Sequence, residues 1–206
     1  MSSHELLLEN MIASGVLHSP HIIDAFYRMD RKYFVPEAYQ EHMYDDIPLP
    51  IGEGQTISQP STVAFMIELL HPQKGDKVLD IGTGSGWTTA LLCTIVGEEG
   101  SVDGLERIDK LVSEGRKHIS PFGFEERCTI QKASDTLGKP GEKFDKILVS
   151  ASSEEMPVQL LEQLKEGGVL VIPVKNTIHR FTKEEEGYIK EEAYPGFGFV
   201  PLIYES

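Results

Sequence analysis

The stretch "VLDIGTGSGW" at residues 78–87 decides the fold class of this chain. Its apolar run ends in Asp80 and continues into Gly82, Gly84 and Gly86. Glycines gather in this way where a buried strand turns sharply into a helix and a ligand must approach the backbone. The stretch therefore predicts a ligand site at the carboxyl end of a strand in an open α/β sheet.

The sequence after this stretch alternates strand-like and helix-like segments. Short apolar runs rich in Val, Ile and Leu predict strands, and apolar residues at helical spacing predict helices. The predicted strands are residues 77–82, 101–106, 128–133, 144–151 and 169–174, and the predicted helices between them are residues 87–97, 108–120 and 157–168. This order indicates a doubly wound, mostly parallel α/β sheet of the Rossmann-like class, with right-handed crossovers.

Both ends of the chain extend this core. Helical spacing predicts N-terminal helices, and a Pro- and Gly-rich segment predicts ordered connecting structure. The predicted helices are residues 4–17, 19–30 and 61–70, the connecting segment is 31–54, and predicted antiparallel strands at the sheet edge are 177–184, 187–194 and 198–204. Ser19 is the expected N-cap of the second helix, with Pro20 at its first position.

The composition is that of an acidic globular protein. Hydrophobic residues make up 40% of the 206 residues, and 33 acidic against 19 basic residues give a net charge of −14. This charge repels phosphate backbones, so we expect no nucleic-acid partner. We expect one domain over residues 1–206: an N-terminal helical cap and substrate loop at 1–60, a cofactor-binding core at 61–175, and a C-terminal strand extension at 176–206.

The cysteines and the hydropathy pattern bear on the compartment. Cys93 and Cys128 lack metal-ligand spacing and are expected to be buried free thiols in a reducing compartment. No secretory segment and no apolar run long enough for a bilayer is recognisable. We therefore expect a cytoplasmic protein with no metal site and no membrane partner.

The spacing of the glycine loop distinguishes two cofactor classes. The dinucleotide fingerprint G-x-G-x-x-G requires glycine at position 87, where this chain has Trp87. Glu106 ends the next predicted strand about 20 residues after Gly86, where a carboxylate suits the ribose hydroxyls of a nucleoside. Asp80 beside the loop would help to hold a cationic sulfonium or amino group. Together these features favour S-adenosylmethionine over a nicotinamide cofactor.

Several longer motifs resemble one family. They are "YDDIPLPIGEGQTISQPSTVAFMIELL" at 44–70, the glycine loop, "FDKILVSA" at 144–151, "LLEQLKEGGVLVIPV" at 160–174 and "PGFGFVPLI" at 195–203. They are similar to the protein-L-isoaspartate O-methyltransferase family of class I methyltransferases. The resemblance covers nearly the whole chain, most tightly from about Val35 onward, and "PLPIGEGQTIS" is its most specific element.

The resemblance implies a reaction and a set of site residues. Members of this family use S-adenosylmethionine to methylate the α-carboxylate of isoaspartyl residues in damaged proteins, and the ester then cyclises to a succinimide that opens partly to aspartate. Partners would be isoaspartyl proteins or peptides, and we expect a monomer. The implied residues are Ser58 and Thr56 as catalytic hydroxyls, Ile57 and Ser61 at the substrate, and Asp80, Gly82, Thr83, Gly84, Gly86, Glu106 and Asp135 at the cofactor.

The residues around Ser58 support this chemistry independently. Ser58 precedes Pro60 and a predicted helix, whose free N–H groups would form an anion site with the hydroxyls of Ser58, Ser61 and Thr62. A carboxylate is already ionised at neutral pH, so methyl transfer needs positioning and desolvation rather than a strong base. We also expect the N-terminal helices to cover the cofactor, because the Gly- and Pro-rich connections place "IGEGQTIS" at 51–58 across the mouth of the sheet.

The chain departs from the family pattern at three points. Ser61 stands where a histidine is common. The usual Gly-Asp-Gly becomes "KASDTLG", with Ser134 in the place of the acid that contacts adenine and Asp135 one position later, and "TAAAPE" becomes "SASSEE" at 150–155. These departures leave two alternatives open: a methyltransferase for another carboxylate on a peptide or small molecule, and a cofactor-binding module that has lost catalysis.

Overall fold

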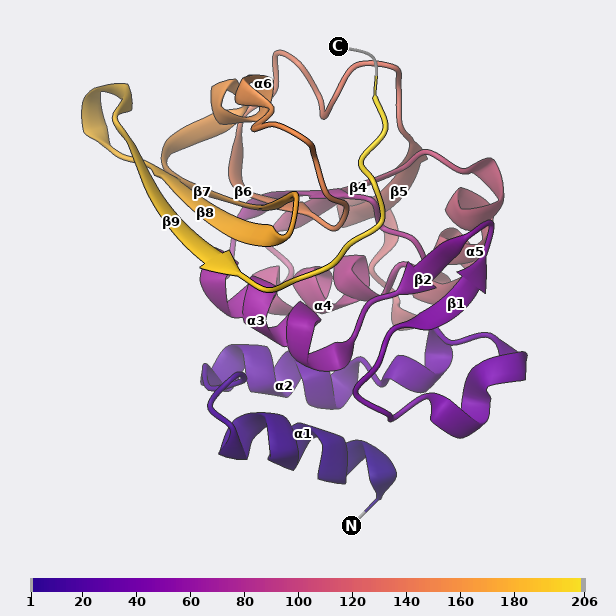
Figure 1. Cartoon of the computed structure of the whole chain (residues 1–206). Coiled ribbons are helices and arrows are strands. Elements are labelled where there is room, and N and C mark those ends of the chain that lie inside the picture. The colour runs from indigo at the N-terminus through magenta and orange to yellow at the C-terminus, as the bar shows by residue number, and fades with distance from the viewer. Residues whose placement is uncertain (1, 205–206) are drawn as a thin grey trace.

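Helices cover both faces of one mixed sheet in the computed structural model, which describes residues 2–204 (Figure 1). In this part of the chain the sheet has seven strands, in the order β5-β4-β3-β6-β7-β8-β9. Neighbours from β5 to β7 are parallel, and β8 and β9 add antiparallel pairs at the edge. The strands are β3 (Lys77–Ile81), β4 (Ser101–Glu106), β5 (Cys128–Lys132), β6 (Phe144–Val149), β7 (Leu164–Val174), β8 (Thr177–Lys183) and β9 (Ile189–Pro195).

The helices form layers on this sheet (Figure 1). α3, α4 and α5 pack on one face and α6 on the other, while α2 packs on α4 and α1 on α2 as an outer layer. The α-helices are α1 (Ser3–Ala13), α2 (Pro20–Arg28), α3 (Pro60–Leu70), α4 (Trp87–Val96), α5 (Asp109–Ile119) and α6 (Val158–Glu162). Short 3₁₀ helices are η1 (Arg31–Tyr33), η2 (Glu37–His42), η3 (Ser120–Phe122), η4 (Glu125–Arg127) and η5 (Glu185–Gly187).

Local sequence signals explain where the N-terminal helices begin. Ser2 and Glu5 form a reciprocal capping box at the start of α1, which satisfies two otherwise free N–H groups. α2 begins with Pro20 and α3 with Pro60, at first-turn positions that need no backbone donor. The predicted start of the second helix is therefore confirmed.

The strand order creates a crevice where the chain reverses direction across the sheet. From β3 the chain moves outward to β4 and β5, and then returns to place β6 on the other side of β3. The loops that leave β3 and β6 therefore run in opposite directions, and they separate at the carboxyl end of the sheet. Ligands of open α/β sheets bind at such a switch point. The predicted doubly wound core with antiparallel edge strands is confirmed.

Three predicted segments differ from the structure. The helix predicted at 157–168 ends at Glu162, because the Gln163 carbonyl accepts the Phe144 N–H and draws the chain into β7. The strand predicted at 198–204 does not join the sheet; Pro201 makes only an isolated bridge with Ser152. An unpredicted hairpin, β1 (Leu49–Gly52) and β2 (Gln55–Ile57), spans the end of the connecting segment and the residues that follow it.

The expectation of free thiols is wrong, because the structure joins Cys93 to Cys128 in a disulfide. Cys93 lies on α4 and Cys128 begins β5, with their Cα atoms 6.2 Å apart. A separation of 35 residues in the sequence concealed the pairing. The crossover brings the helix beside the strand, and both side chains are buried there.

Asp80 is a buried carboxylate at the end of β3. Its Oδ2 accepts hydrogen bonds from Thr89 Oγ1 at 2.6 Å and Thr88 Oγ1 at 3.1 Å, while its Oδ1 has no partner among the described residues. Burial raises the pKa of Asp80 to about 6, against the lowering effect of the two hydroxyls. The side chain thus joins the end of β3 to the first turn of α4. Its contribution to the free energy of unfolding depends on pH.

We predict that Asp80→Asn becomes relatively more stable as the pH rises. The pKa of Asp80 in the fold, about 6, lies above its ordinary value of 3.8, so the folded state binds the proton more tightly. Its contribution to the free energy of unfolding therefore falls as the pH rises through this interval. The free energy of unfolding of Asp80→Asn, measured relative to that of the wild type, should therefore rise by up to about 3 kcal/mol between about pH 4 and about pH 7.

Urea denaturation at several pH values within this interval measures the difference. Asp24→Asn, which removes an exposed carboxylate on α2, is the matched control. A difference that stays constant across the interval would show that Asp80 does not change protonation there.

Candidate active site

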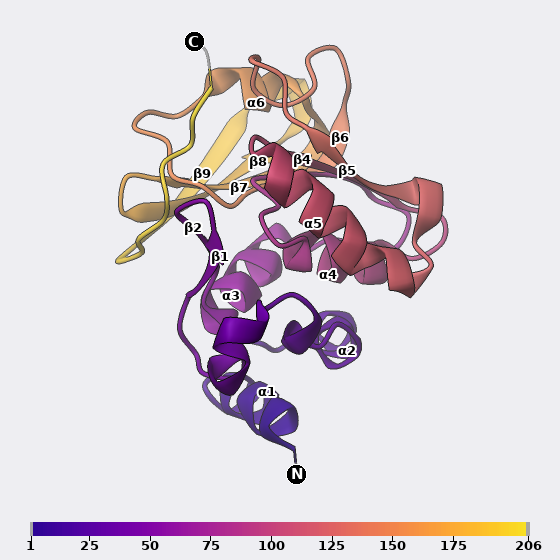
Figure 2. The ribbon, with the colours of Figure 1, turned by 90° about the vertical axis from the view of Figure 1, so that its right-hand side faces the viewer.

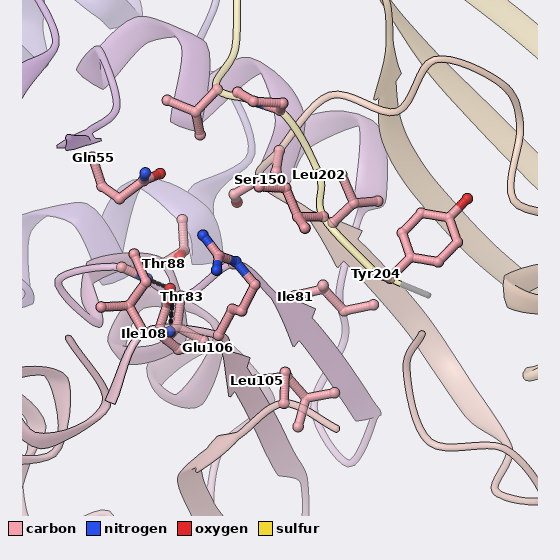
Figure 3. A pocket seen from close by; sticks show the side chains of 18 of the residues that line it. Gln55, Ile81, Thr83, Thr88, Leu105, Glu106, Ile108, Ser150, Leu202 and Tyr204 are labelled. Carbon is pink, nitrogen blue, oxygen red and sulfur yellow. Dashed lines mark hydrogen bonds between the residues drawn. The ribbon is translucent and has the colours of Figure 1, made fainter. Parts of the chain in front are cut away.

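A cavity opens at the carboxyl ends of the parallel strands (Figure 3). Ile81 and Leu105, from β3 and β4, form part of its lining. The β1–β2 hairpin contributes residues 55–57 and the C-terminal segment contributes residues 200–204. The hairpin and this segment lie beside each other at the mouth of the sheet (Figure 2). The cavity therefore occupies the crevice that the strand order creates.

The glycine loop after β3 forms one wall of the cavity. Gly82, Gly84 and Gly86 have φ values of 81°, 51° and 86°, a region that favours glycine. The Gly82 N–H donates to the Leu105 carbonyl at 2.8 Å, which places the start of the loop against β4. Gly104 of β4 leaves room for the loop, since a Cβ there would lie 2.8 Å from Thr83 Cγ2 and 2.9 Å from the Thr129 carbonyl oxygen.

Glu106 connects this loop to β4. Its Oε2 accepts the Gly84 N–H at 3.0 Å, and its Oε1 accepts the Ile108 N–H at 2.8 Å. The side chain is buried and lines the cavity (Figure 3). Each oxygen retains acceptor capacity toward the cavity, because a carboxylate oxygen accepts more than one hydrogen bond. Paired hydroxyls of a ligand would find a fixed acceptor here.

The residues present fit S-adenosylmethionine. Thr83 lines the cavity, and its buried Oγ1 has no hydrogen-bond partner among the described residues. A buried hydroxyl without a partner is costly, and a polar ligand beside it would remove that cost. Glu106 is the acidic residue of the lining and suits two ribose hydroxyls, while Ile81, Leu105 and Leu137 offer apolar surface for a base.

Ser58 and Thr56 stand where this cavity meets a second one. Both residues line the cavity at the strand ends, and both also line a neighbouring cavity with Ser150 and Val200. The second cavity is bordered by the aromatic side chains of Phe65, Phe197 and Phe199. Within residues 2–204 neither the Ser58 nor the Thr56 hydroxyl is committed to a hydrogen bond, so both are free to contact a ligand.

The start of α3 is not the open anion site that we expected. The Asp46 carboxylate accepts the Ser61 N–H at 2.8 Å and the Gln59 Nε2 at 3.2 Å. Gln59 Nε2 also donates to Ser61 Oγ at 3.0 Å. An acid of the chain itself therefore takes the position that the sequence suggested for a substrate carboxylate, and it complements the helix dipole there.

Most predicted site residues come together at this cavity. Those that line it are Thr56, Ile57, Ser58, Gly82, Thr83, Gly84 and Glu106. Ser61 lines only the second cavity and a surface groove near α1. Gly86 provides packing space instead, because a Cβ there would lie 3.1 Å from Ile130 Cδ1 and 3.2 Å from the Gly115 carbonyl oxygen.

Two predicted acids do not line the cavity. Asp80 lies beneath the loop, bonded to α4, and Asp135 is exposed. Ser134 and Thr136, on either side of Asp135, line the cavity in its place. The chain lies in a loop after β5 at this point, so adjacent side chains project in different directions, and the one-residue offset from the family pattern directs the acid outward.

The cover of the cavity also differs from the prediction. The lining contains no residue of α1 or α2, which pack on the far side of α4. The hairpin, which contains most of the "IGEGQTIS" segment expected at the mouth, and residues 200–204 cover the cavity (Figure 2). Sequence reasoning included Gln55 and Ser150 only as parts of longer segments, and it missed the C-terminal segment. The similarity of "PGFGFVPLI" to the family is the available signal, although the residue pattern at 198–204 predicts an edge strand.

Two classes of site receive no candidate in the described part of the chain. Its His, Cys, Asp and Glu side chains do not gather in groups of three or more that suit a metal ion. None of its helices combines the length and the apolar character that crossing a membrane requires.

Comparison with known proteins identifies relatives over the whole length. A family profile described as protein-L-isoaspartate(D-aspartate) O-methyltransferase matches residues 2–206. The protein-L-isoaspartate O-methyltransferase of Ignicoccus hospitalis is 39% identical over 206 residues, covering 97% of both chains. The enzyme of that name from Fervidobacterium nodosum is 43% identical over 200 residues, covering 96% of this chain and 100% of its own.

Solved structures agree with this assignment. A crystal structure from Plasmodium falciparum, of a protein assigned as a protein-L-isoaspartate O-methyltransferase and bound to S-adenosyl-L-homocysteine, superposes with a TM-score of 0.86 at 26% identity, over 98% of this chain and 99% of that one. A second protein-L-isoaspartate O-methyltransferase superposes with a TM-score of 0.85 at 29% identity, over 97% of this chain and 65% of its own. The chain therefore belongs to the protein-L-isoaspartate(D-aspartate) O-methyltransferase family, and it is a class I S-adenosylmethionine-dependent methyltransferase.

Proposed function

We propose that the chain methylates isoaspartyl carboxylates where its two cavities meet. S-adenosylmethionine would lie in the cavity at the switch point, with Glu106 at its ribose and Thr83 and the glycine loop at its polar groups. The isoaspartyl residue would reach the same point through the second cavity, where Ser58 and Thr56 orient its carboxylate. The observation that carries this proposal is that Ser58, Thr56, Ser150 and Val200 border both cavities.

Methyl transfer to a carboxylate requires correct positioning of the reacting groups and does not require a strong base. Bound S-adenosylmethionine supplies an electrophilic methyl group on a sulfonium. A carboxylate with a pKa of about 3.5 is ionised at neutral pH, so one of its oxygens forms the new O–C bond as the S–C bond breaks. The Ser58 and Thr56 hydroxyls would direct the other oxygen, and residues 200–204 would exclude water from the reacting groups.

The aromatic border of the second cavity suits a polypeptide substrate. Phe65 stacks on Phe197, with ring centroids 5.3 Å apart, and forms an edge-on contact with Tyr194. Aromatic surfaces of this kind can contact the apolar parts of many different side chains, so they do not select one particular residue. We infer that residues flanking the isoaspartate lie against this border, and that damaged proteins and peptides are the partners.

We also propose that the protein is a cytoplasmic monomer. Its exposed large hydrophobic residues are scattered over separate elements, including Leu6 on α1, Tyr27 on α2 and Val158 on α6, and scattered single residues do not make an association surface. Light scattering after gel filtration tests the monomer. Thiol labelling in fractionated cells tests the location, because it reports both the compartment and whether Cys93 and Cys128 are joined there.

The central test is methyl transfer to one synthetic peptide in isoaspartyl and aspartyl forms. With labelled S-adenosylmethionine, label is expected in the isoaspartyl form alone. Equal labelling of both forms would point to a general carboxylate methyltransferase. Cofactor binding without labelling of either form would show that catalysis has been lost.

We predict that Ser58→Ala impairs catalysis more than cofactor binding. Removing one hydrogen bond to a charged group costs about 1.5–3 kcal/mol, so kcat/KM for the isoaspartyl peptide should fall by about 10- to 150-fold. Calorimetric titration should show little change in affinity for S-adenosylhomocysteine. Ser113→Ala, on the exposed side of α5, is the control. A variant with normal peptide kinetics would remove Ser58 from the proposed site.

We predict the reverse pattern for Glu106→Gln. The substitution replaces one oxygen with an N–H₂ group that cannot accept a hydrogen bond from Gly84, Ile108 or a ribose hydroxyl. Affinity for S-adenosylhomocysteine should weaken by about 1.5–3 kcal/mol in calorimetry. With cofactor at saturation the peptide KM should stay close to the wild-type value. Glu98→Gln, at an exposed position, controls for the loss of one negative charge, and unchanged cofactor affinity would contradict the role given to Glu106.

A further inference from the structure

Arg31 is a buried guanidinium that binds the backbone around Ser58. Its side chain belongs to η1 and only 1% of the residue's surface is exposed. Nη1 donates to the carbonyls of Met43 at 3.0 Å and Asp45 at 3.1 Å, and Nη2 donates to those of Ile47 at 2.8 Å and Ser58 at 3.1 Å. One side chain therefore joins the segment before the hairpin to the segment after it.

The charge of Arg31 is not neutralised by direct contact with an acid. Within residues 2–204 no carboxylate oxygen lies within 4.0 Å of its guanidinium nitrogens, and Nε has no hydrogen-bond partner. Burial lowers the pKa of Arg31 to about 10, while the carboxylates of Asp46 and Asp45 act in the opposite direction. The group stays charged at neutral pH. Burying a cation without a paired acid costs desolvation free energy, which the four hydrogen bonds to backbone carbonyls must offset.

Arg31 also contacts Trp87, which lines the cofactor cavity. The guanidinium carbon lies 5.6 Å from the centroid of the Trp87 ring, a cation–π contact. Trp87 follows directly after the glycine loop and lines the cavity. Its indole N–H donates to the Met29 carbonyl at 2.9 Å, which fixes the plane of the ring. Arg31 thus touches the backbone of Ser58 and the residue that follows the cofactor loop.

We propose that Arg31 is the positioning residue that sets Ser58 against the cofactor cavity. It acts through the Ser58 carbonyl and the Trp87 ring and does not itself contact the substrate. This inference rests on the proposed role of Ser58. The planar fork of a guanidinium can reach four carbonyls from two segments at once, whereas an ammonium group concentrates its donors at one point. Arg31→Lys therefore keeps the charge and loses the geometry.

The test compares Arg31→Lys with a matched change elsewhere. Arg127 also donates to two backbone carbonyls, those of Cys93 and Gly97, and lies 5.3 Å from the Phe124 ring centroid, away from both cavities that Ser58 borders. Arg127→Lys should lower Tm and leave the peptide KM unchanged. Arg31→Lys should lower kcat/KM for the isoaspartyl peptide by up to about 100-fold, mostly through KM, and weaken S-adenosylhomocysteine binding far less.

A double variant distinguishes this inference from the proposed function. If Arg31 acts through Ser58, Arg31→Lys should have a smaller effect on peptide kcat/KM in a Ser58→Ala background than in the wild type. Equal effects in both backgrounds, or a normal peptide KM in Arg31→Lys with a lowered Tm, would overturn the inference. Normal kinetics of Ser58→Ala alone would instead remove the proposed role of Ser58.

A measurement on the wild-type protein does not depend on the folding of any variant. Peptide added to the S-adenosylhomocysteine complex should shift the NMR signals of the Arg31 guanidinium, because the Ser58 carbonyl that it holds lies beside the bound carboxylate. The Arg127 signals should stay in place. Arg31 signals that do not move at saturating peptide would overturn the inference.

Discussion

The site depends on one carboxylate that connects two loops. Glu106 accepts an N–H from the glycine loop after β3 and another from the chain after β4, so the two strand ends keep a fixed separation. Backbone N–H groups cannot rotate away as side chains can, and two such bonds leave the carboxylate a single orientation toward the cavity. The cavity therefore needs no ligand to define its wall. The same acid that would read a ribose also supports the loop around it.

The parts that could be predicted from the sequence are those with local causes. Buried parallel strands read as apolar runs, and the glycine loop needs left-handed backbone that glycine allows at little cost. The hairpin β1–β2, the cover by residues 200–204 and the Cys93–Cys128 pair depend on partners far away in the sequence. Helical periodicity placed the N-terminal helices correctly along the chain and said nothing about the face on which they pack.

The acids illustrate the same limit within the site. The sequence places Asp80, Glu106 and Asp135 at strand ends, and only Glu106 lines the cavity. Asp80 accepts hydrogen bonds from two threonine hydroxyls on α4, and Asp135 is exposed between Ser134 and Thr136, which line the cavity. At the start of α3, Asp46 takes the N–H that we assigned to a ligand, because a nearby carboxylate of the chain itself binds there at no cost in association entropy. Residue type and spacing identify candidates, while side-chain direction selects among them.

Gly104 carries a chemical consequence of its own. It follows Asp103, and this Asp-Gly pair occurs once in the chain. A glycine leaves the following nitrogen unhindered, so such pairs are where an aspartate can cyclise and turn into the very lesion that this family repairs. No residue with a side chain fits at position 104, because Thr83 and Thr129 leave no space for a Cβ. The fold restrains the aspartate instead: β4 lies between two paired strands, and Lys139 Nζ holds the Asp103 carboxylate at 2.8 Å. Extended, paired backbone and an engaged carboxylate oppose this ring closure, so the Asp103–Gly104 pair should cyclise more slowly than an Asp-Gly pair in an exposed loop.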